Sequence, residues 1–306
     1  MRSEAQAITC TANNSSAKKG SDEYKIGAFY KSYMDKDTRD ELGITPLQPS
    51  LNTIDSLDSK ADLAPLMAKI QQQGASLPFG WFVNNDAKNS SEYALYLSQS
   101  GLGLPDRDYY LKDDEKFTKI RASYEQYITD ILAKSGVENA ADAAKSVIAF
   151  ESALAEAQWS RVQSRDATKS YNKMTVANKL TGDFDLAAFF NSAGVDTSDI
   201  IVRQPSYLEG FADVYKETDL ATWKNYLKFH FVSGYAQLLS TDLVDLKFDF
   251  YSTTLRGVKE QAPLWKKAVD ASNSVLGEIL GKVYVKDNFP PEAKARMEEL
   301  VDNVIK

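Results

Sequence analysis

Apolar side chains recur at helical spacing over most of the chain. A one-sided stripe from Ser21 onward predicts a helix, and shorter stripes at 51–57 and 63–70 predict two more, the second closed by Gly74. The same spacing predicts long helices at roughly 113–134, 140–159, 206–216, 219–240, 242–260, 263–286 and 291–305. Residues 161–205 are interrupted by glycines and lack this pattern, so they form a looser region.

One stretch has the character of strands instead. Leu77–Val83 and Tyr93–Leu97 are bulky, β-prone runs, and the turn-forming cluster Asn84–Ser90 lies between them. This order predicts an antiparallel hairpin near residues 77–99. We therefore expect a mainly α fold, a large multi-helix body with one small β-hairpin.

The segment Gly101–Leu111 follows the hairpin and reads Gly-Leu-Gly-Leu-Pro-Asp-Arg-Asp-Tyr-Tyr-Leu. Its glycines accept positive φ or a close backbone contact, and Pro105 fixes its own φ. Asp106 and Asp108 suit the start of a helix. These residues predict a rigid corner between a strand and a helix. The two aspartates could instead form an acid/base pair, but the adjacent Arg107 favours capping and ion pairing.

Composition narrows the classes of function. The chain has 36 Lys and Arg against 43 Asp and Glu, and a net charge of −7 argues against a nucleic-acid-binding protein. No apolar run approaches the 18 or so residues of a spanning helix, and no signal peptide is visible. Cys10 is the only cysteine, which excludes an intrachain disulfide. His230 is the only histidine, and its aromatic, helical surroundings favour a structural imidazole.

The corner segment also closely resembles the hallmark of the neprilysin and endothelin-converting-enzyme family of zinc metalloendopeptidases. Four other segments agree with this family in order: Lys25–Asp35, Tyr171–Thr175, Leu264–Lys267 and Leu280–Lys294. The residues of the hallmark, for which we expect a structural role, are Gly101, Gly103, Pro105, Asp106, Arg107, Asp108, Tyr109 and Tyr110.

The resemblance covers nearly the whole chain, but only the non-catalytic N-terminal portion of the family. It implies that residues 1–285 form a helical cap that restricts access to a substrate chamber, and that 286–306 begin the catalytic region. The zinc site of such an enzyme uses H-E-x-x-H and a further carboxylate, which a chain with one histidine cannot supply. We therefore expect no catalytic, cofactor-binding or metal-ligating residue here, zinc only in the complete family enzyme, and an inactive isolated chain.

The partners implied by the resemblance are peptide substrates and the C-terminal catalytic half. The resemblance also implies an exported protein, periplasmic or extracellular. The predicted helix 291–305 places Met297, Leu300, Val301 and Val304 on one face, and exposure of this stripe would drive self-association. The alternative function is a stand-alone, non-catalytic helical module that binds peptides or proteins. DNA downstream of Lys306 that encodes H-E-x-x-H would favour the peptidase.

Overall fold

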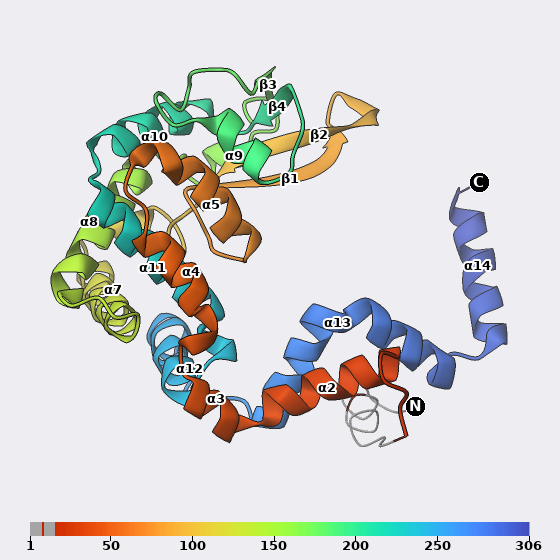
Figure 1. The fold of residues 1–306 in the computed structure, drawn as a ribbon. Coiled ribbons are helices and arrows are strands. Elements are labelled where there is room, and N and C mark those ends of the chain that lie inside the picture. The colour runs from red at the N-terminus through yellow and green to blue at the C-terminus, as the bar shows by residue number, and fades with distance from the viewer. Residues whose placement is uncertain (1–7, 9–15, 306) are drawn as a thin grey trace. The chain divides into compact units, whose positions relative to one another are not determined.

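The computed structural model describes residue 8 and residues 16–305. The chain divides into two compact units, one formed by residues 1–41 with 259–306 and the other by residues 42–258. We call them the first and the second unit. The structure confirms the mainly helical fold expected from the sequence (Figure 1). The corner segment Gly101–Leu111 belongs to the second unit.

The first unit is built from helices. They are α2 (Asp22–Met34), α3 (Lys36–Leu42, which ends at the boundary), α13 (Leu264–Asn288) and α14 (Pro291–Ile305). Helix α2 begins at Ser21, whose hydroxyl accepts a hydrogen bond from Tyr24 N at 3.2 Å. Helices α2 and α13 pack side by side, and Ile26, Val269 and Leu280 are buried between them. The described residues of α14 include none that is buried.

The second unit holds most of the long helices that the apolar pattern predicts. Its helices are α4 (Gln48–Asp55), α5 (Leu63–Gln72), α6 (Asp108–Leu111), α7 (Glu115–Lys134), α8 (Ala140–Ala157), α9 (Leu186–Ser192), α10 (Pro205–Glu217), α11 (Leu220–Tyr235) and α12 (Thr241–Phe248). Helix α12 continues as a π-helix, Asp249–Thr254, and α8 packs against α7, α10 and α11. These helices therefore surround α8, which carries the central residue of the site described below.

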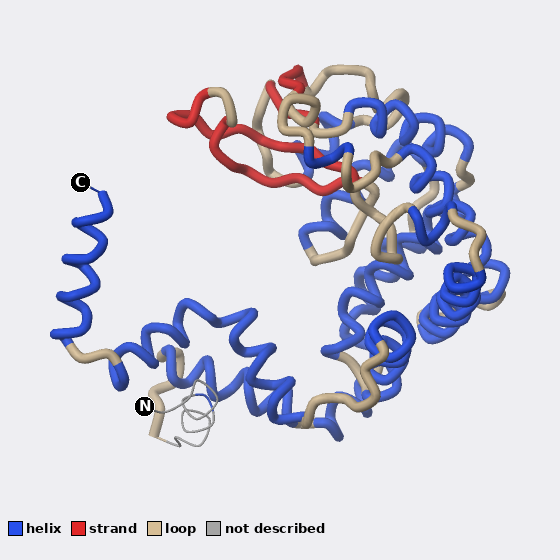
Figure 2. Tube along the Cα trace, turned by 180° about the vertical axis from the view of Figure 1, so that it is seen from behind, coloured by secondary structure: helices blue, strands red, loops and turns tan. Residues whose placement is uncertain are grey.

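The sheet is larger than the predicted hairpin. Strands β1 (Phe79–Asp86) and β2 (Asn89–Gln99) form that hairpin, while β3 (Asn172–Thr175) and β4 (Asp199–Val202) complete a four-stranded sheet in the order β1-β2-β4-β3. Strand β4 runs parallel to β2 and antiparallel to β3. Both added strands have four residues, too few for a period-two pattern to stand out. Figure 2 shows the hairpin as the longest pair of strands.

The start of β1 is fixed in the core by aromatic packing. Phe79 is fully buried, and its ring makes edge contacts with Phe184, Phe189 and Phe211 at centroid distances of 5.1 to 5.4 Å. Phe79 pairs with Gln99, the last residue of β2. The packing therefore fixes the point at which the chain leaves the sheet and enters the corner.

Candidate functional site

The corner spans residues 100–107, between the end of β2 and the start of α6. Gly101 has a φ of +88°, and a Cβ built on it would lie 2.5 Å from the Cα of Pro78. A Cβ on Gly103 would lie 1.8 Å from the hydroxyl of Tyr124. One glycine therefore provides a left-handed conformation and the other a close approach, the two properties expected from the sequence.

The inner face of the corner rests on a buried carboxyl group. Glu151 of α8 is fully buried, and its Oε2 accepts hydrogen bonds from the hydroxyls of Tyr110 at 2.5 Å and Tyr124 at 2.9 Å. His230 Nε2 lies 2.6 Å from Glu151 Oε1. Burial, together with the charge of Glu151, raises the pKa of both tyrosines well above 10. We call Glu151, Tyr110, Tyr124 and His230 the Glu151 cluster.

Two further hydroxyl contacts hold the corner backbone, one from the Glu151 cluster and one from the π-helix. Tyr110 accepts a hydrogen bond from Leu104 N at 2.9 Å, so its hydroxyl joins the corner to Glu151. Tyr251 of the π-helix donates to the carbonyl oxygen of Gly103 at 3.0 Å. The inner face thus connects the corner to α7, α8, α11 and the π-helix.

Sequence reasoning missed Glu151. The residue lies within an alanine-rich helix, and nothing close to it in the sequence resembles a catalytic or metal-binding motif. The one available signal is its position on the buried face of α8, between Val147 and Leu154. A carboxyl group at such a position needs donors from elsewhere in the fold.

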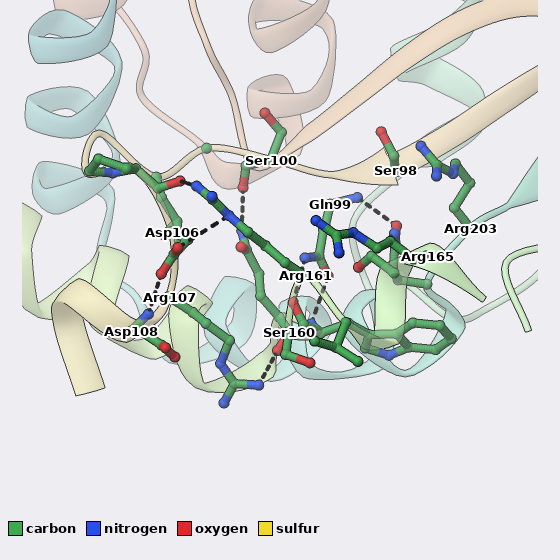
Figure 3. Close-up of a pocket in the computed structure, with 18 of the residues that line it drawn as sticks. Ser98, Gln99, Ser100, Asp106, Arg107, Asp108, Ser160, Arg161, Arg165 and Arg203 are labelled. Atoms are coloured by element: carbon green, nitrogen blue, oxygen red, sulfur yellow. Dashed lines mark hydrogen bonds and ion pairs between the residues drawn. The ribbon is translucent and has the colours of Figure 1, made fainter. Parts of the chain in front are cut away.

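The outer face of the corner borders a pocket of about 610 Å³. Its walls are the end of β2, the corner, the segment 158–165 and the two residues that follow β4. Four arginines line it: Arg107, Arg161, Arg165 and Arg203 (Figure 3). We call it the arginine pocket.

The ion pairs of the corner differ from those expected. Arg107 was the predicted partner of the aspartates, but Asp106 pairs with Arg161 at 3.2 Å and Asp108 with Lys112 at 2.7 Å. Arg107 instead donates to the carbonyl oxygen of Gln158 at 2.6 Å, because the end of α8 leaves carbonyl groups without helical partners.

The expected capping by Asp106 is present, although Arg107 occupies the N-cap position of α6. Asp106 Oδ1 accepts a hydrogen bond from Asp108 N at 2.8 Å. Each aspartate is thus held by a cation, in agreement with capping and ion pairing. The carbonyl oxygen of Pro105 accepts a hydrogen bond from the guanidinium group of Arg161 at 3.0 Å, and the ring of Tyr109 packs edge-on against Phe117.

The described part of the chain contains no candidate zinc centre. Among residue 8 and residues 16–305, no group of three or more His, Cys, Asp or Glu side chains is arranged to hold a metal ion. The only histidine is engaged with Glu151, and Cys10 lies outside the described residues. None of the helices in the described part combines the length and apolar character that crossing a membrane requires.

A multi-helix body with one small four-stranded sheet defines a mainly α fold class. The sequence model for the N-terminal region of peptidase family M13 matches residues 2–306. The chain belongs to peptidase family M13.

Similar proteins agree with this assignment. The chain is 27% identical to endothelin-converting enzyme 1 of Cavia porcellus over 304 residues, which cover 94% of this chain and 40% of that protein. The open-state structure of the Mycobacterium tuberculosis zinc metalloprotease ZMP1 superposes with a TM-score of 0.90 and 32% identity, covering 98% of this chain and 47% of that one. A PepO structure from Lactobacillus rhamnosis shares the fold, with a TM-score of 0.81 at 19% identity. The chain spans less than half the length of each of these relatives.

Proposed function

We propose that this chain is the non-catalytic N-terminal portion of a zinc metalloendopeptidase that cleaves peptides. The match of residues 2–306 to the N-terminal family model carries this proposal. In it, residues 1–285 form the helical cap of the substrate chamber, and residues 286–306 begin the catalytic region. The hallmark residues of the corner shape the cap and take no part in catalysis. The complete enzyme acts in an exported compartment.

The isolated chain is inactive in this proposal. Its sequence holds one histidine and no H-E-x-x-H, whereas a catalytic zinc needs three protein ligands and an open position. The zinc and the general base therefore belong to the catalytic half. The peptide is bound between that half and the cap, which keeps folded proteins out.

Helix α14 supplies a surface for the catalytic half. Met297, Leu300, Val301 and Val304 are all exposed along it, although they are apolar. Fully burying these four side chains would contribute about 6–12 kcal/mol as an upper bound, at about 1.5–3 kcal/mol each. The isolated chain therefore self-associates through this stripe, which light scattering over a concentration series detects. A chain that stays monomeric, with strong hydrogen-exchange protection across 291–305, would favour a self-sufficient binding module.

The inactivity is tested by metal analysis and a peptide assay. The purified chain is incubated with zinc, desalted and assayed for bound metal, and cleavage of a quenched fluorescent peptide is followed in parallel. We expect no stoichiometric zinc and no cleavage. One tightly held zinc per chain, together with cleavage that EDTA abolishes, would overturn the proposal. DNA downstream of the Lys306 codon provides an independent test, because the proposal requires it to encode H-E-x-x-H.

A further inference from the structure

We propose that the arginine pocket binds a carboxylate group of a peptide ligand through Arg165 and Arg203. This inference rests on the proposed function and adds the chemical group that the cap recognises. Arg165 and Arg203 differ from the other two arginines of the pocket because their guanidinium groups make no hydrogen bond or ion pair with the described part of the fold.

Arg107 and Arg161 are engaged within the fold. Arg107 donates to the carbonyl oxygen of Gln158 at 2.6 Å, where α8 ends. Arg161 pairs with Asp106 at 3.2 Å and donates to the carbonyl oxygen of Pro105 at 3.0 Å. The charge of Arg161 is therefore paired with Asp106, and Arg107 is held by a carbonyl oxygen at the end of α8.

Arg165 and Arg203 are not engaged in this way by the described residues. Neither guanidinium group has a hydrogen bond or an ion pair to any described side chain or backbone group, while both line the pocket. Figure 3 labels both arginines among the residues that line the pocket. The chain as a whole carries a net charge of −7, so this local excess of positive charge runs against its overall balance.

The backbone of both arginines is held in place. Arg203 directly follows β4, and its N–H donates to the carbonyl oxygen of Leu97 at 2.9 Å, which extends the β2–β4 pairing by one residue. Arg165 ends the 3-10 turn Gln163–Arg165, and its N–H donates to the carbonyl oxygen of Val162 at 3.2 Å. Only the side chains are left to adjust to a ligand.

Buried amide side chains fix the walls. Gln99 exchanges two hydrogen bonds with the backbone of Trp159, at 2.7 and 2.9 Å, and its own N–H donates to Gln204 Oε1 at 3.0 Å. Gln158 donates to the carbonyl oxygen of Ser100 at 2.8 Å. Gln158 and Gln204 are both buried. Because these contacts already join β2, the corner and the 158–165 segment, the pocket needs no ligand to hold its shape.

The chemistry of the pocket fits a carboxylate. A guanidinium group presents a planar fork of N–H donors that matches the two oxygens of a carboxylate. The volume of about 610 Å³ lies within the range of small-ligand sites and accepts the end of a peptide or one long acidic side chain. Peptides offer this group from two sources, the C-terminal α-carboxylate and the side chains of Asp and Glu.

Three fluorescently labelled peptides of one length separate these sources. The first has a free C-terminus and no acidic side chain, the second is the same peptide with an amidated C-terminus, and the third is amidated and carries one internal Glu. Fluorescence anisotropy with the 306-residue chain measures each dissociation constant. We expect the amidated neutral peptide to bind at least tenfold more weakly than one or both of the others. The peptide that regains affinity identifies the source of the carboxylate.

Substitutions then locate the site. Arg165→Gln and Arg203→Gln keep a polar side chain but remove the charge, and each is expected to weaken binding of the carboxylate peptide roughly tenfold. Neither should change the affinity for the amidated neutral peptide. The matched control is Arg256→Gln, which removes an exposed arginine of the same unit outside the pocket and should leave all three affinities unchanged.

Several results would overturn the inference. Equal binding of the free and amidated peptides, or an equal loss with Arg256→Gln, would show that no specific carboxylate site exists. Binding of inorganic phosphate, lost in the two variants, with no binding of any peptide would assign the pocket to a different anion. Failure of the proposed function can be distinguished from failure of this inference. Downstream DNA without H-E-x-x-H would contradict the peptidase proposal, but it would not change the measured peptide affinities.

Discussion

The two faces of the glycine corner treat polar groups in opposite ways. On the inner face, the Glu151 cluster is buried, and its carboxyl group has a partner for each oxygen. On the outer face, the arginine pocket leaves Arg165 and Arg203 without partners among the described residues. Both faces share one backbone segment, residues 100–107. The comparison therefore separates the polar groups that stabilise the fold from the guanidinium groups that are available to bind a ligand.

The cost of an unpaired group differs between the two faces. A polar group without a partner on the inner face would bear the full penalty of its lost hydration, whereas an arginine at the open pocket stays in contact with water. Unpaired charge is therefore tolerated at the pocket and excluded from the cluster. This difference sets the order of effects that we expect from substitutions.

The largest effect is expected for Glu151→Ala. This change leaves the hydroxyls of Tyr110 and Tyr124 and the imidazole of His230 buried without their acceptor. We expect the free energy of unfolding to fall by about 3–5 kcal/mol. Urea unfolding followed by circular dichroism measures it.

Glu156→Ala provides the matched control on the same helix. The side chain of Glu156 is exposed, and its loss should change the free energy of unfolding by no more than about 0.5 kcal/mol. If Glu151→Ala lowered the free energy of unfolding no more than Glu156→Ala does, the Glu151 cluster would not stabilise the fold.

The second effect comes from Gly103, whose backbone lies close against Tyr124 of the Glu151 cluster. Gly103→Ala would place a methyl group 1.8 Å from the Tyr124 hydroxyl, so that tyrosine must leave Glu151 or the corner must shift. We expect a loss of roughly 1–3 kcal/mol, seen as a lower melting temperature. Gly80→Ala is the control, because a Cβ there makes only ordinary contacts, with Ser98 Oγ at 3.7 Å and Ser100 Cβ at 4.0 Å. Equal melting temperatures for the two variants would contradict the close approach.

The sequence predicted the parts of this arrangement that depend on local spacing. Apolar periodicity located the long helices, and the Gly-x-Gly-x-Pro order located the corner with both properties of its glycines. The partners of the corner were not predictable in this way. Asp106 meets Arg161 and not its neighbour Arg107, because the fold brings the end of α8 against the corner. Arg203 follows β4 and lines the pocket because β4 pairs with β2. Strand β4 has only four residues, too few for its alternation of apolar and polar residues to be recognised in the sequence.

The third effect is a loss of stability in alkali, which also arises from the inner face. Burial and the charge of Glu151 raise the folded-state pKa of Tyr110 and Tyr124 above the ordinary value of 10. Their contribution is therefore complete below pH 10 and declines as the pH rises above 10, by about 1.4 kcal/mol per pH unit for each phenol. Tyr110→Phe should remove the contribution of one phenol, so the slope between pH 10 and 11 should become shallower by up to about 1.4 kcal/mol per pH unit. Unfolding measured at several pH values gives the slope, and an unchanged slope would show that Tyr110 ionises freely in the folded protein.

The smallest effect tests the outer face with two arginines of the same pocket. Arg107→Gln removes a charged donor from the carbonyl oxygen of Gln158, and we expect a loss of about 1–2 kcal/mol in the free energy of unfolding. Arg165→Gln removes a guanidinium group without a described partner and should change that free energy by no more than about 0.5 kcal/mol. Paired urea titrations in one buffer resolve the difference. A loss for Arg165→Gln as large as that for Arg107→Gln would mean that the fold itself uses Arg165. The contrast between the faces would then fail, since the pocket would hold no charge that is free for a ligand.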